Sequence, residues 1–71
     1  MPYPRYWSGT VNSEDAFGEP ITNEFVDGAT VMGPWAMMSP ASFKRMGRGV
    51  GTGKGQRYKK QEDGRWLKVE G

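Results

Sequence analysis

The pattern of β-favouring residues between positions 21 and 32, on both sides of a turn signal, predicts a β-hairpin. Residues 21–26 and 29–32 both favour β-strand, and the dipeptide Asp27-Gly28 separates them. Such a dipeptide supplies the positive φ angles that a two-residue type I′ turn requires. We therefore expect two antiparallel strands that are joined at Asp27-Gly28.

A second hairpin is expected near the C-terminus. Residues 56–61 and 65–69 favour strands and flank the turn Glu62-Asp63-Gly64. In this hairpin Tyr58 and Trp66 are able to face one another. The preceding segment, residues 47–55, has glycine at every second position.

A short helix is predicted over residues 40–46, between the two hairpins. Ser39 suits the N-cap, Pro40 suits the first helical position, and a glycine follows the end. Phe43 and Met46 stand three positions apart and therefore share one face of this helix.

These elements predict a small β-rich α+β domain with two β-hairpins and one short helix. Residues 1–71 are expected to form a single domain with four successive parts: an extended aromatic arm (1–12), a knuckle-hairpin-helix core (13–46), a glycine-rich segment (47–55) and a basic hairpin with the tail (56–71). The prolines of the arm exclude a central place in a sheet, so we expect it at a sheet edge or draped over the core. The core is expected to contain Phe25, Val31, Trp35, Met37, Phe43 and Met46.

Composition limits how such a chain is stabilised. With 71 residues and no cysteine it has room for only a small core and no disulfide, but it contains three Trp, three Tyr, three Phe and five Met. Each buried aromatic residue removes about 150–250 Å² from water, so a core of aromatic residues and methionines is feasible. Self-association or a partner is the alternative source of stability.

Charge is distributed unevenly between the two halves of the chain. Residues 1–42 carry one basic side chain against five acidic ones, and residues 43–71 carry nine basic against three acidic, so −4 and +6 give the net +2. The basic half can attract an anionic partner. Alternatively, the two halves neutralise each other by packing together.

Four positions, Ser13, Ala16, Ser39 and Ser42, have the spacing of a zinc site. Cysteines there would form two C-x2-C pairs separated by 22 residues, which suits a tetrahedral metal. The chain has no Cys and no His, so we expect no bound metal and no cofactor. The alternatives are a chance spacing, with Ser39 as a helix cap and Ser13 in a turn, and deliberate removal of cysteines.

Longer sequence strings around these positions are a more specific signal of a protein family than the spacing alone. They are Phe-Val-Asp-Gly at 25–28, Gly-Pro-Trp-Ala-Met-Met at 33–38 and Gly-Val-Gly-Thr-Gly-Lys-Gly-Gln-Arg-Tyr at 49–58. In these strings the chain resembles, over residues 13–60, short and mostly uncharacterised bacteriophage and bacterial proteins. Those proteins have one Cys-x-x-Cys pair where this chain has Ser13 and Ala16, and a second where it has Ser39 and Ser42. The resemblance implies a treble-clef or zinc-ribbon finger whose metal-ligand cysteines are replaced here, and it supplies no function.

The basic half also suggests a nucleic-acid contact. Cations alternate there with aromatic residues, which suits phosphate contacts and stacking on single-stranded bases. The candidate residues are Arg48, Lys54, Arg57, Tyr58, Lys59, Lys60, Arg65 and Trp66. A half-buried structural hairpin has the same alternation, and the glycines of 47–55 suit either a phosphate-contacting loop or a strand that accommodates Trp35 or Trp66.

We therefore expect a small non-enzymatic binding module of phage or bacterial type that contacts nucleic acid. The alternative is a protein-interaction or virion component that uses its aromatic arm and surface on a protein partner. An enzyme is not expected, because the chain lacks His and Cys and its acidic residues fall mostly in turns.

The sequence also gives an expectation about location. Residues 1–5 lack the apolar stretch of a secretory signal, and no segment approaches the length of a membrane span. We expect a cytoplasmic protein, in the host cytoplasm for a phage protein, with the virion as the alternative.

Overall fold

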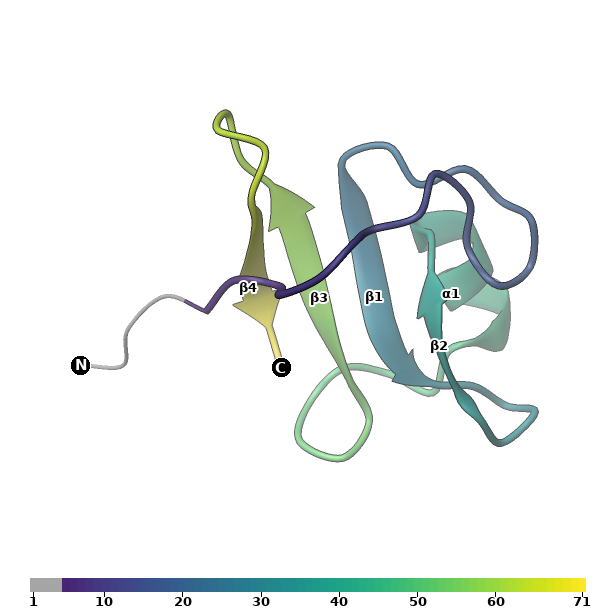
Figure 1. Cartoon of the computed structure of the whole chain (residues 1–71). Helices are drawn as coiled ribbons and strands as arrows, with labels where there is room; N and C mark the ends of the chain where they lie inside the picture. The colour runs from purple at the N-terminus through teal and green to yellow at the C-terminus, as the bar shows by residue number, and fades with distance from the viewer. Residues whose placement is uncertain (1–4) are drawn as a thin grey trace.

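The computed structural model describes residues 5–71 and places them in a four-stranded antiparallel sheet with one short helix (Figure 1). The elements are β1 (Glu24–Ala29), β2 (Trp35–Met38), α1 (Pro40–Met46), β3 (Gly55–Lys60) and β4 (Trp66–Glu70). The strand order is β2-β1-β3-β4, so β2 and β4 are the outer strands. The expected small, mostly β fold with two hairpins and one helix is confirmed. Within residues 5–71, no helix has both the length and the apolar character needed to cross a bilayer.

The helix and the second hairpin lie where the sequence predicts them. The Ser39 hydroxyl caps α1 by accepting a hydrogen bond from the Ser42 N–H at 3.2 Å, and Pro40 opens the first turn. β3 and β4 pair antiparallel, and at their turn the Gln61 N–H donates to the Arg65 carbonyl at 2.7 Å. Both elements follow from signals that lie within a few residues of each other.

The first hairpin forms, but its turn lies later in the chain than the sequence predicts. Asp27 and Gly28 lie inside β1, and the chain turns over residues 30–34 instead. There the Thr30 N–H donates to the Pro34 carbonyl at 3.2 Å, and the Thr30 carbonyl accepts a bond from the Gly33 N–H at 3.0 Å. The expected turn at Asp27-Gly28 is therefore wrong.

Gly28 serves the close approach of two strands rather than a turn. It stands opposite Gly55 of β3. A Cβ at Gly28 would lie 2.7 Å from the Lys54 carbonyl oxygen and 2.8 Å from the Gly55 Cα. Backbone atoms cannot yield to contacts this short, so sheet packing explains the glycine.

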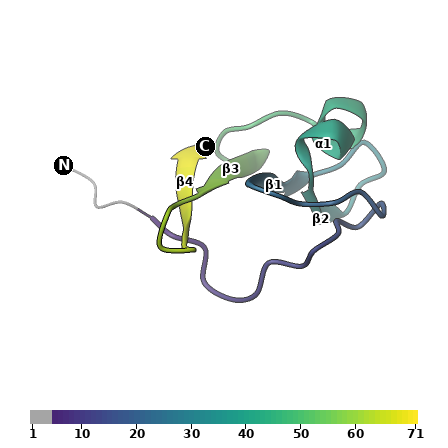
Figure 2. The same cartoon turned by 90° about the horizontal axis from the view of Figure 1, so that it is seen from above.

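The two faces of the sheet are covered by different parts of the chain (Figures 1 and 2). Val26 and Met38 stand opposite each other, are fully buried, and lie on the face that α1 covers. Phe25 precedes Val26 and so points to the other face. There the N-terminal segment crosses the sheet and Trp7 packs on Phe25, with ring centroids 5.3 Å apart. The Trp7 N–H also donates to the Trp66 carbonyl at 2.9 Å, so this segment borders β4 as well.

The buried core is smaller than expected and partly made of other residues. Its hydrophobic members are Ile21, Phe25, Val26 and Met38. Of the other expected core residues, Met37, Phe43 and Met46 are half-buried. Val31 and Trp35 are exposed, so their assignment to the core is wrong. Because the chain turns over residues 30–34, Val31 falls in the turn and Trp35 begins an outer strand.

Candidate functional site

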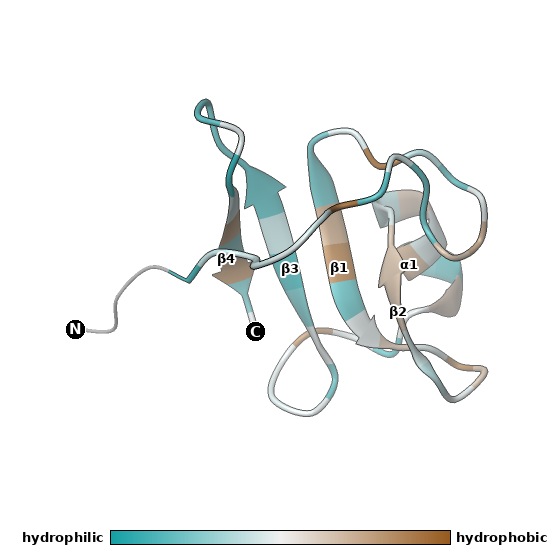
Figure 3. Cartoon of the chain, viewed as in Figure 1, coloured by the Kyte–Doolittle hydropathy of each residue, from teal (hydrophilic) through white to brown (hydrophobic). Residues whose placement is uncertain are grey.

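Three apolar side chains are exposed together at the end of the β1–β2 hairpin. Val31, Met32 and Trp35 expose 58%, 70% and 48% of their surface, and we call them the tip surface. Residues 30–38 include no charged side chain, and Figure 3 shows apolar colour at the outermost part of the turn between β1 and β2. Single exposed apolar residues are ordinary, but three of them within five residues of one hairpin end, a tryptophan included, are typical of an interaction site.

Two basic residues lie beside the end of β1, on the side away from β2. The Arg48 N–H donates to the Ala29 carbonyl at 3.1 Å, and the Lys54 carbonyl accepts from the Ala29 N–H at 2.8 Å, which anchors both beside the residue that precedes the turn. Both side chains are exposed, and neither forms an ion pair within residues 5–71. The nearby Asp27 on β1 is half-buried, and burial raises the pKa of its carboxyl group. The charges near this end of β1 are therefore mixed, with two cations and one half-buried carboxyl group.

Two of the predicted nucleic-acid contacts, Arg57 and Arg65, are engaged within the molecule. Arg57 Nε lies 2.6 Å from Glu70 Oε1, and its Nη1 lies 3.1 Å from Glu24 Oε1. Arg65 Nε lies 2.7 Å from Asp63 Oδ2. Each guanidinium group also lies over an aromatic ring, 5.4 Å and 4.0 Å from the ring centres. The pair with Glu24 joins the acidic half of the chain to the basic half.

The two predicted stacking residues, Tyr58 and Trp66, help to cover the core. Both pack on Phe25, with ring centroids 5.1 Å and 5.2 Å away, and Trp7 meets Tyr58 edge-on at 5.4 Å. Burial raises the pKa of Tyr58, and the nearby Asp27 carboxylate raises it further. Because both rings are half-buried, stacking on nucleic-acid bases would compete with this packing.

The other four predicted contacts are exposed and form no ion pair with any residue the structure describes. They are Arg48, Lys54, Lys59 and Lys60. Lys54 precedes β3 and Lys60 ends it, which separates the two by about 20 Å along an extended strand. Lys59 and Lys60 are neighbours on this strand and point to opposite faces. Arg48 and Lys54 lie near Ala29, whereas Lys59 and Lys60 stand at the other end of β3, so the four cations do not form one patch.

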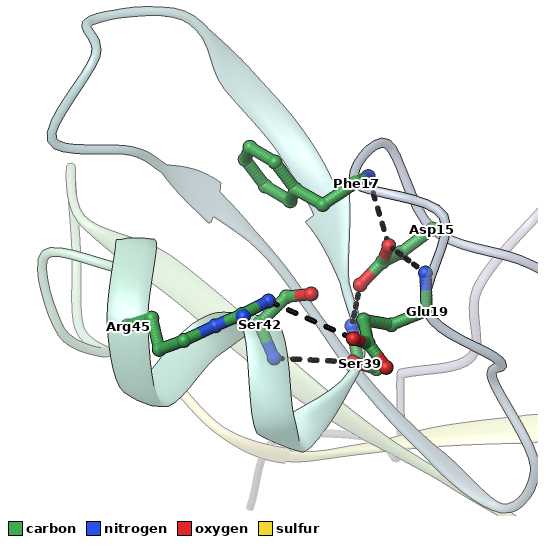
Figure 4. Close-up of polar contacts among 6 residues, drawn as sticks. All are labelled: Asp15, Phe17, Glu19, Ser39, Ser42 and Arg45. Atoms are coloured by element: carbon green, nitrogen blue, oxygen red, sulfur yellow. Dashed lines mark hydrogen bonds and ion pairs between the residues drawn. The ribbon is translucent and has the colours of Figure 1, made fainter.

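Asp15 is a buried carboxylate that the sequence pattern did not single out. It is only 8% exposed. Its Oδ1 accepts hydrogen bonds from the Phe17 N–H at 2.8 Å and the Glu19 N–H at 2.9 Å, and its Oδ2 accepts one from the Ser39 N–H at 2.8 Å (Figure 4). Asp in a turn is a recognised signal for the local part of this arrangement. The bond to Ser39 ties the N-terminal turn to the start of α1.

The four positions with zinc spacing lie on the two segments that this carboxylate joins. Ser13 and Ala16 are exposed, whereas Ser39 and Ser42 are buried. The Ala16 N–H donates to the Met37 carbonyl at 3.2 Å. Hydroxyl and methyl groups do not fit zinc, which prefers thiolate and imidazole. Among residues 5–71, no three side chains of the types Asp, Glu, His and Cys are grouped so as to hold a metal ion.

Hydrogen bonding lowers the pKa of Asp15. Burial alone would raise it, but the Ser42 hydroxyl and the three backbone N–H donors outweigh burial and lower the pKa from 3.8 to about 2. The Ser42 hydroxyl is buried and faces the carboxylate, although no hydrogen bond of regular geometry joins them. The unfolded chain does not hold these donors in place, so ionised Asp15 stabilises the folded state.

We expect the free energy of unfolding to fall as the pH drops from about 4 to about 2. The pKa of Asp15 is lower in the folded state, so its contribution is complete above the unfolded pKa and is lost as the pH falls through the folded pKa. The lowered pKa corresponds to about 2 kcal/mol. Urea denaturation at a series of pH values, followed by tryptophan fluorescence, measures this loss. Constant stability across this range would contradict the hydrogen bonds assigned to Asp15.

Comparisons with protein-family models, with curated proteins and with solved structures find no match to the chain.

Proposed function

We propose that this chain is a small non-enzymatic binding module that contacts a protein partner through its tip surface. The observation that carries the proposal is the joint exposure of Val31, Met32 and Trp35 at the end of one hairpin. A domain with so few buried hydrophobic residues gains stability from every apolar side chain that it covers. Large apolar side chains that stay outside are best explained by a partner that covers them.

The residues of the tip surface indicate the chemistry of the partner. Trp35 is the anchor, because tryptophan contributes strongly to binding where a pocket removes it from water. The matching surface on the partner is an apolar pocket that accepts this ring.

Nucleic-acid binding through the basic half is the less favoured function. Arg57, Tyr58, Arg65 and Trp66 are engaged in ion pairs or in covering Phe25. The cations that stay free of ion pairs stand at separate places along and around β3. A nucleic-acid site would have to use these scattered cations without the predicted aromatic stacking.

Photo-crosslinking from the tip surface tests the proposal. Met32 is replaced by photo-methionine in chemically synthesised protein, which is incubated with a lysate of the producing cell and irradiated. We expect a discrete protein adduct that disappears when Trp35→Ala is added and persists with Lys59→Ala and Lys60→Ala. Trp35→Ala is expected to cost less than about 1 kcal/mol of stability, since the side chain is half exposed. The adducted protein, once purified, is expected to bind the wild type and not Trp35→Ala in calorimetry.

Two results would count against the protein-partner proposal. One is the absence of any adduct that depends on Trp35. The other is salt-dependent retention of single-stranded or duplex DNA that Lys59→Ala and Lys60→Ala abolish and Trp35→Ala leaves intact. The second result would establish the basic half as the binding surface.

We also propose that the fold is zinc-finger-like and has lost its metal. The support is the sequence resemblance, together with the position of Asp15 between Ser13 and Ala16 and its hydrogen bond to Ser39. In this proposal the carboxylate cross-links the two segments that two Cys pairs and a zinc ion would otherwise join.

A further inference from the structure

We propose that the partner inserts an arginine side chain between Trp35 and Asp27, with its guanidinium group stacked on the indole ring and paired with the carboxylate. The inference rests on the proposed function, since it specifies how the tip surface is recognised. It adds a recognition residue outside the tip surface, Asp27, and the chemistry of the side chain that meets it.

The register of the sheet brings Trp35 and Asp27 to the same face. In the pairing of β1 with β2, Trp35 stands opposite Ala29 and Asp27 stands opposite Met37. Residues opposite each other across two strands, and residues two positions apart on one strand, share a face of the sheet. Trp35 and Asp27 are therefore diagonal neighbours, about 7–8 Å apart, which is a separation that aromatic and long side chains can span.

This face is accessible beside the tip surface. It is the face on which Trp7 of the N-terminal segment packs against Phe25. The N-terminal segment crosses β1 nearer its start, and the ends of β1 and β2 at the tip lie clear of it (Figure 1). In agreement, Asp27 is only half-buried and 48% of the Trp35 surface is exposed. A side chain of a partner can therefore reach both residues.

Asp27 has no partner for its charge within residues 5–71. Its carboxyl group takes part in none of the ion pairs and accepts none of the side-chain hydrogen bonds in this part of the chain. Opposite it stand Met37 on β2 and Gln56 on β3, which are both uncharged. Burial raises the pKa of this carboxyl group, and no cation among the described residues offsets the effect. A carboxylate that has lost water without gaining a donor is best satisfied by a cation that brings its own N–H groups.

The cations of the chain lie on other sides of Asp27. Arg48 and Lys54 bond to β1 through their backbones on the side away from β2. Arg5 and Lys68 bond to each other at β4, two strands away from β1. Residues 30–38, which include β2 and the turn before it, carry no charged side chain. The approach to Asp27 from the tip surface is therefore open to a cation from outside.

The chain itself shows how an arginine uses such a pair of groups. Arg65 lies 4.0 Å from the centre of the Tyr6 ring and pairs with Asp63 at 2.7 Å. Arg57 is likewise held by an aromatic ring and by carboxylates. The planar guanidinium group stacks by its face and donates hydrogen bonds by its edge, which a lysine cannot do at once. Beside the tip surface the ring and the carboxylate are both present, and the arginine is left for the partner to supply.

Replacement of one arginine by its neutral analogue tests the proposal. The probe is a displayed library of random linear peptides, selected on the wild-type protein, and we expect the selected peptides to share an arginine. The best peptide is then synthesised with arginine or with citrulline at that position and titrated by calorimetry. We expect citrulline to weaken binding to the wild type about tenfold or more, because it has the shape of arginine without the charge.

The same two peptides are titrated against Asp27→Asn, with Glu62→Gln as the matched control. Against Asp27→Asn they are expected to bind within about threefold of each other, since the carboxylate that distinguishes them is gone. Glu62→Gln removes the same charge from an exposed turn residue and is expected to keep the full difference. A full difference on Asp27→Asn would overturn the pairing with Asp27.

Urea denaturation of Asp27→Asn provides a check without any peptide. We expect the variant to unfold at the same urea concentration as the wild type or a higher one, because a half-buried carboxylate without a partner opposes folding. Unfolding at a clearly lower concentration would mean that Asp27 is already paired within the molecule, and it would overturn the proposal.

The remaining outcomes separate this proposal from the proposed function. Selected peptides that need Trp35 but lack an arginine, or that bind equally well with lysine in its place, would overturn the arginine and leave the tip surface as a binding site. Self-association of the free protein that Asp27→Asn abolishes would show a second copy as the occupant and overturn the foreign partner. If no selected peptide depends on Trp35, the tip surface itself is not a binding site and both proposals fail.

Discussion

The Phe25→Ala variant is expected to lose about 3–5 kcal/mol of stability. Phe25 is fully buried, and its ring meets Trp7, Tyr58 and Trp66 at centroid distances of 5.3, 5.1 and 5.2 Å. These three rings come from the N-terminal segment, β3 and β4, so one side chain holds three parts of the chain on the same face of the sheet. Small domains have only about 5–15 kcal/mol in total, so this loss is a large fraction of the free energy of unfolding.

Urea denaturation followed by circular dichroism measures the effect, with Trp35→Ala as the matched control. Both substitutions remove an aromatic ring, but Trp35 is half exposed and is expected to lose less than about 1 kcal/mol. Phe25→Leu, which keeps most of the volume, is expected to fall between the two. Equal losses for Phe25→Ala and Trp35→Ala would show that the aromatic cluster on Phe25 does not hold the fold together.

Helix α1 and the second hairpin could be predicted from sequence because their signals are local. Ser39 caps the helix through a bond to Ser42, three residues away. The turn between β3 and β4 is closed by Gln61 and Arg65, with Gly64 at a φ of 88°. In each case the residue type and the contact that requires it lie within one turn of the chain.

The first hairpin shows where local signals fail. Asp27-Gly28 has the composition of a tight turn. Sequence alone cannot distinguish a glycine that is required by a turn from a glycine that is required by the close approach of another backbone. The approaching residue is Gly55, which reaches Gly28 only after β3 has paired with β1. The misplaced turn then led to the wrong burial of Val31 and Trp35. Hydrophobicity indicates that a side chain favours burial, but it does not distinguish burial in the core from burial by a partner.

For the candidate site, the sequence predicts which types of residue take part but not which of them are free to bind. The sequence identified cations and aromatic rings, but whether they are free depends on distant partners. Arg57 bonds to Glu24, 33 residues away, and Asp15 bonds to Ser39, 24 residues away. Such pairs follow from the topology of the sheet and leave no signature in spacing. That Trp35 is exposed, and is therefore a candidate contact residue, follows only from its position on the outer strand β2.

The Asp15→Asn variant is expected to lose about 2–3 kcal/mol near neutral pH. Asp15 offers two oxygens to three backbone N–H groups. The amide of asparagine offers one oxygen, so its NH₂ group must face an N–H donor in a site that is only 8% exposed. When the oxygen faces Phe17 and Glu19, the Ser39 N–H at the start of α1 loses its acceptor. We therefore expect the contact between the N-terminal turn and the helix to weaken first.

Hydrogen exchange of the Ser39 amide and urea denaturation together measure this effect. Glu14→Gln is the matched control, since it removes the same charge from an exposed neighbour and is expected to change stability by less than about 0.5 kcal/mol. Burial on its own raises the pKa of Asp15, and its hydrogen bonds lower it to about 2. The wild type should therefore lose its advantage over Asp15→Asn as the pH falls from about 4 to about 2. A stability difference that stays constant over this range would mean that the asparagine acts through shape alone, and that the charge of Asp15 does not join the two segments.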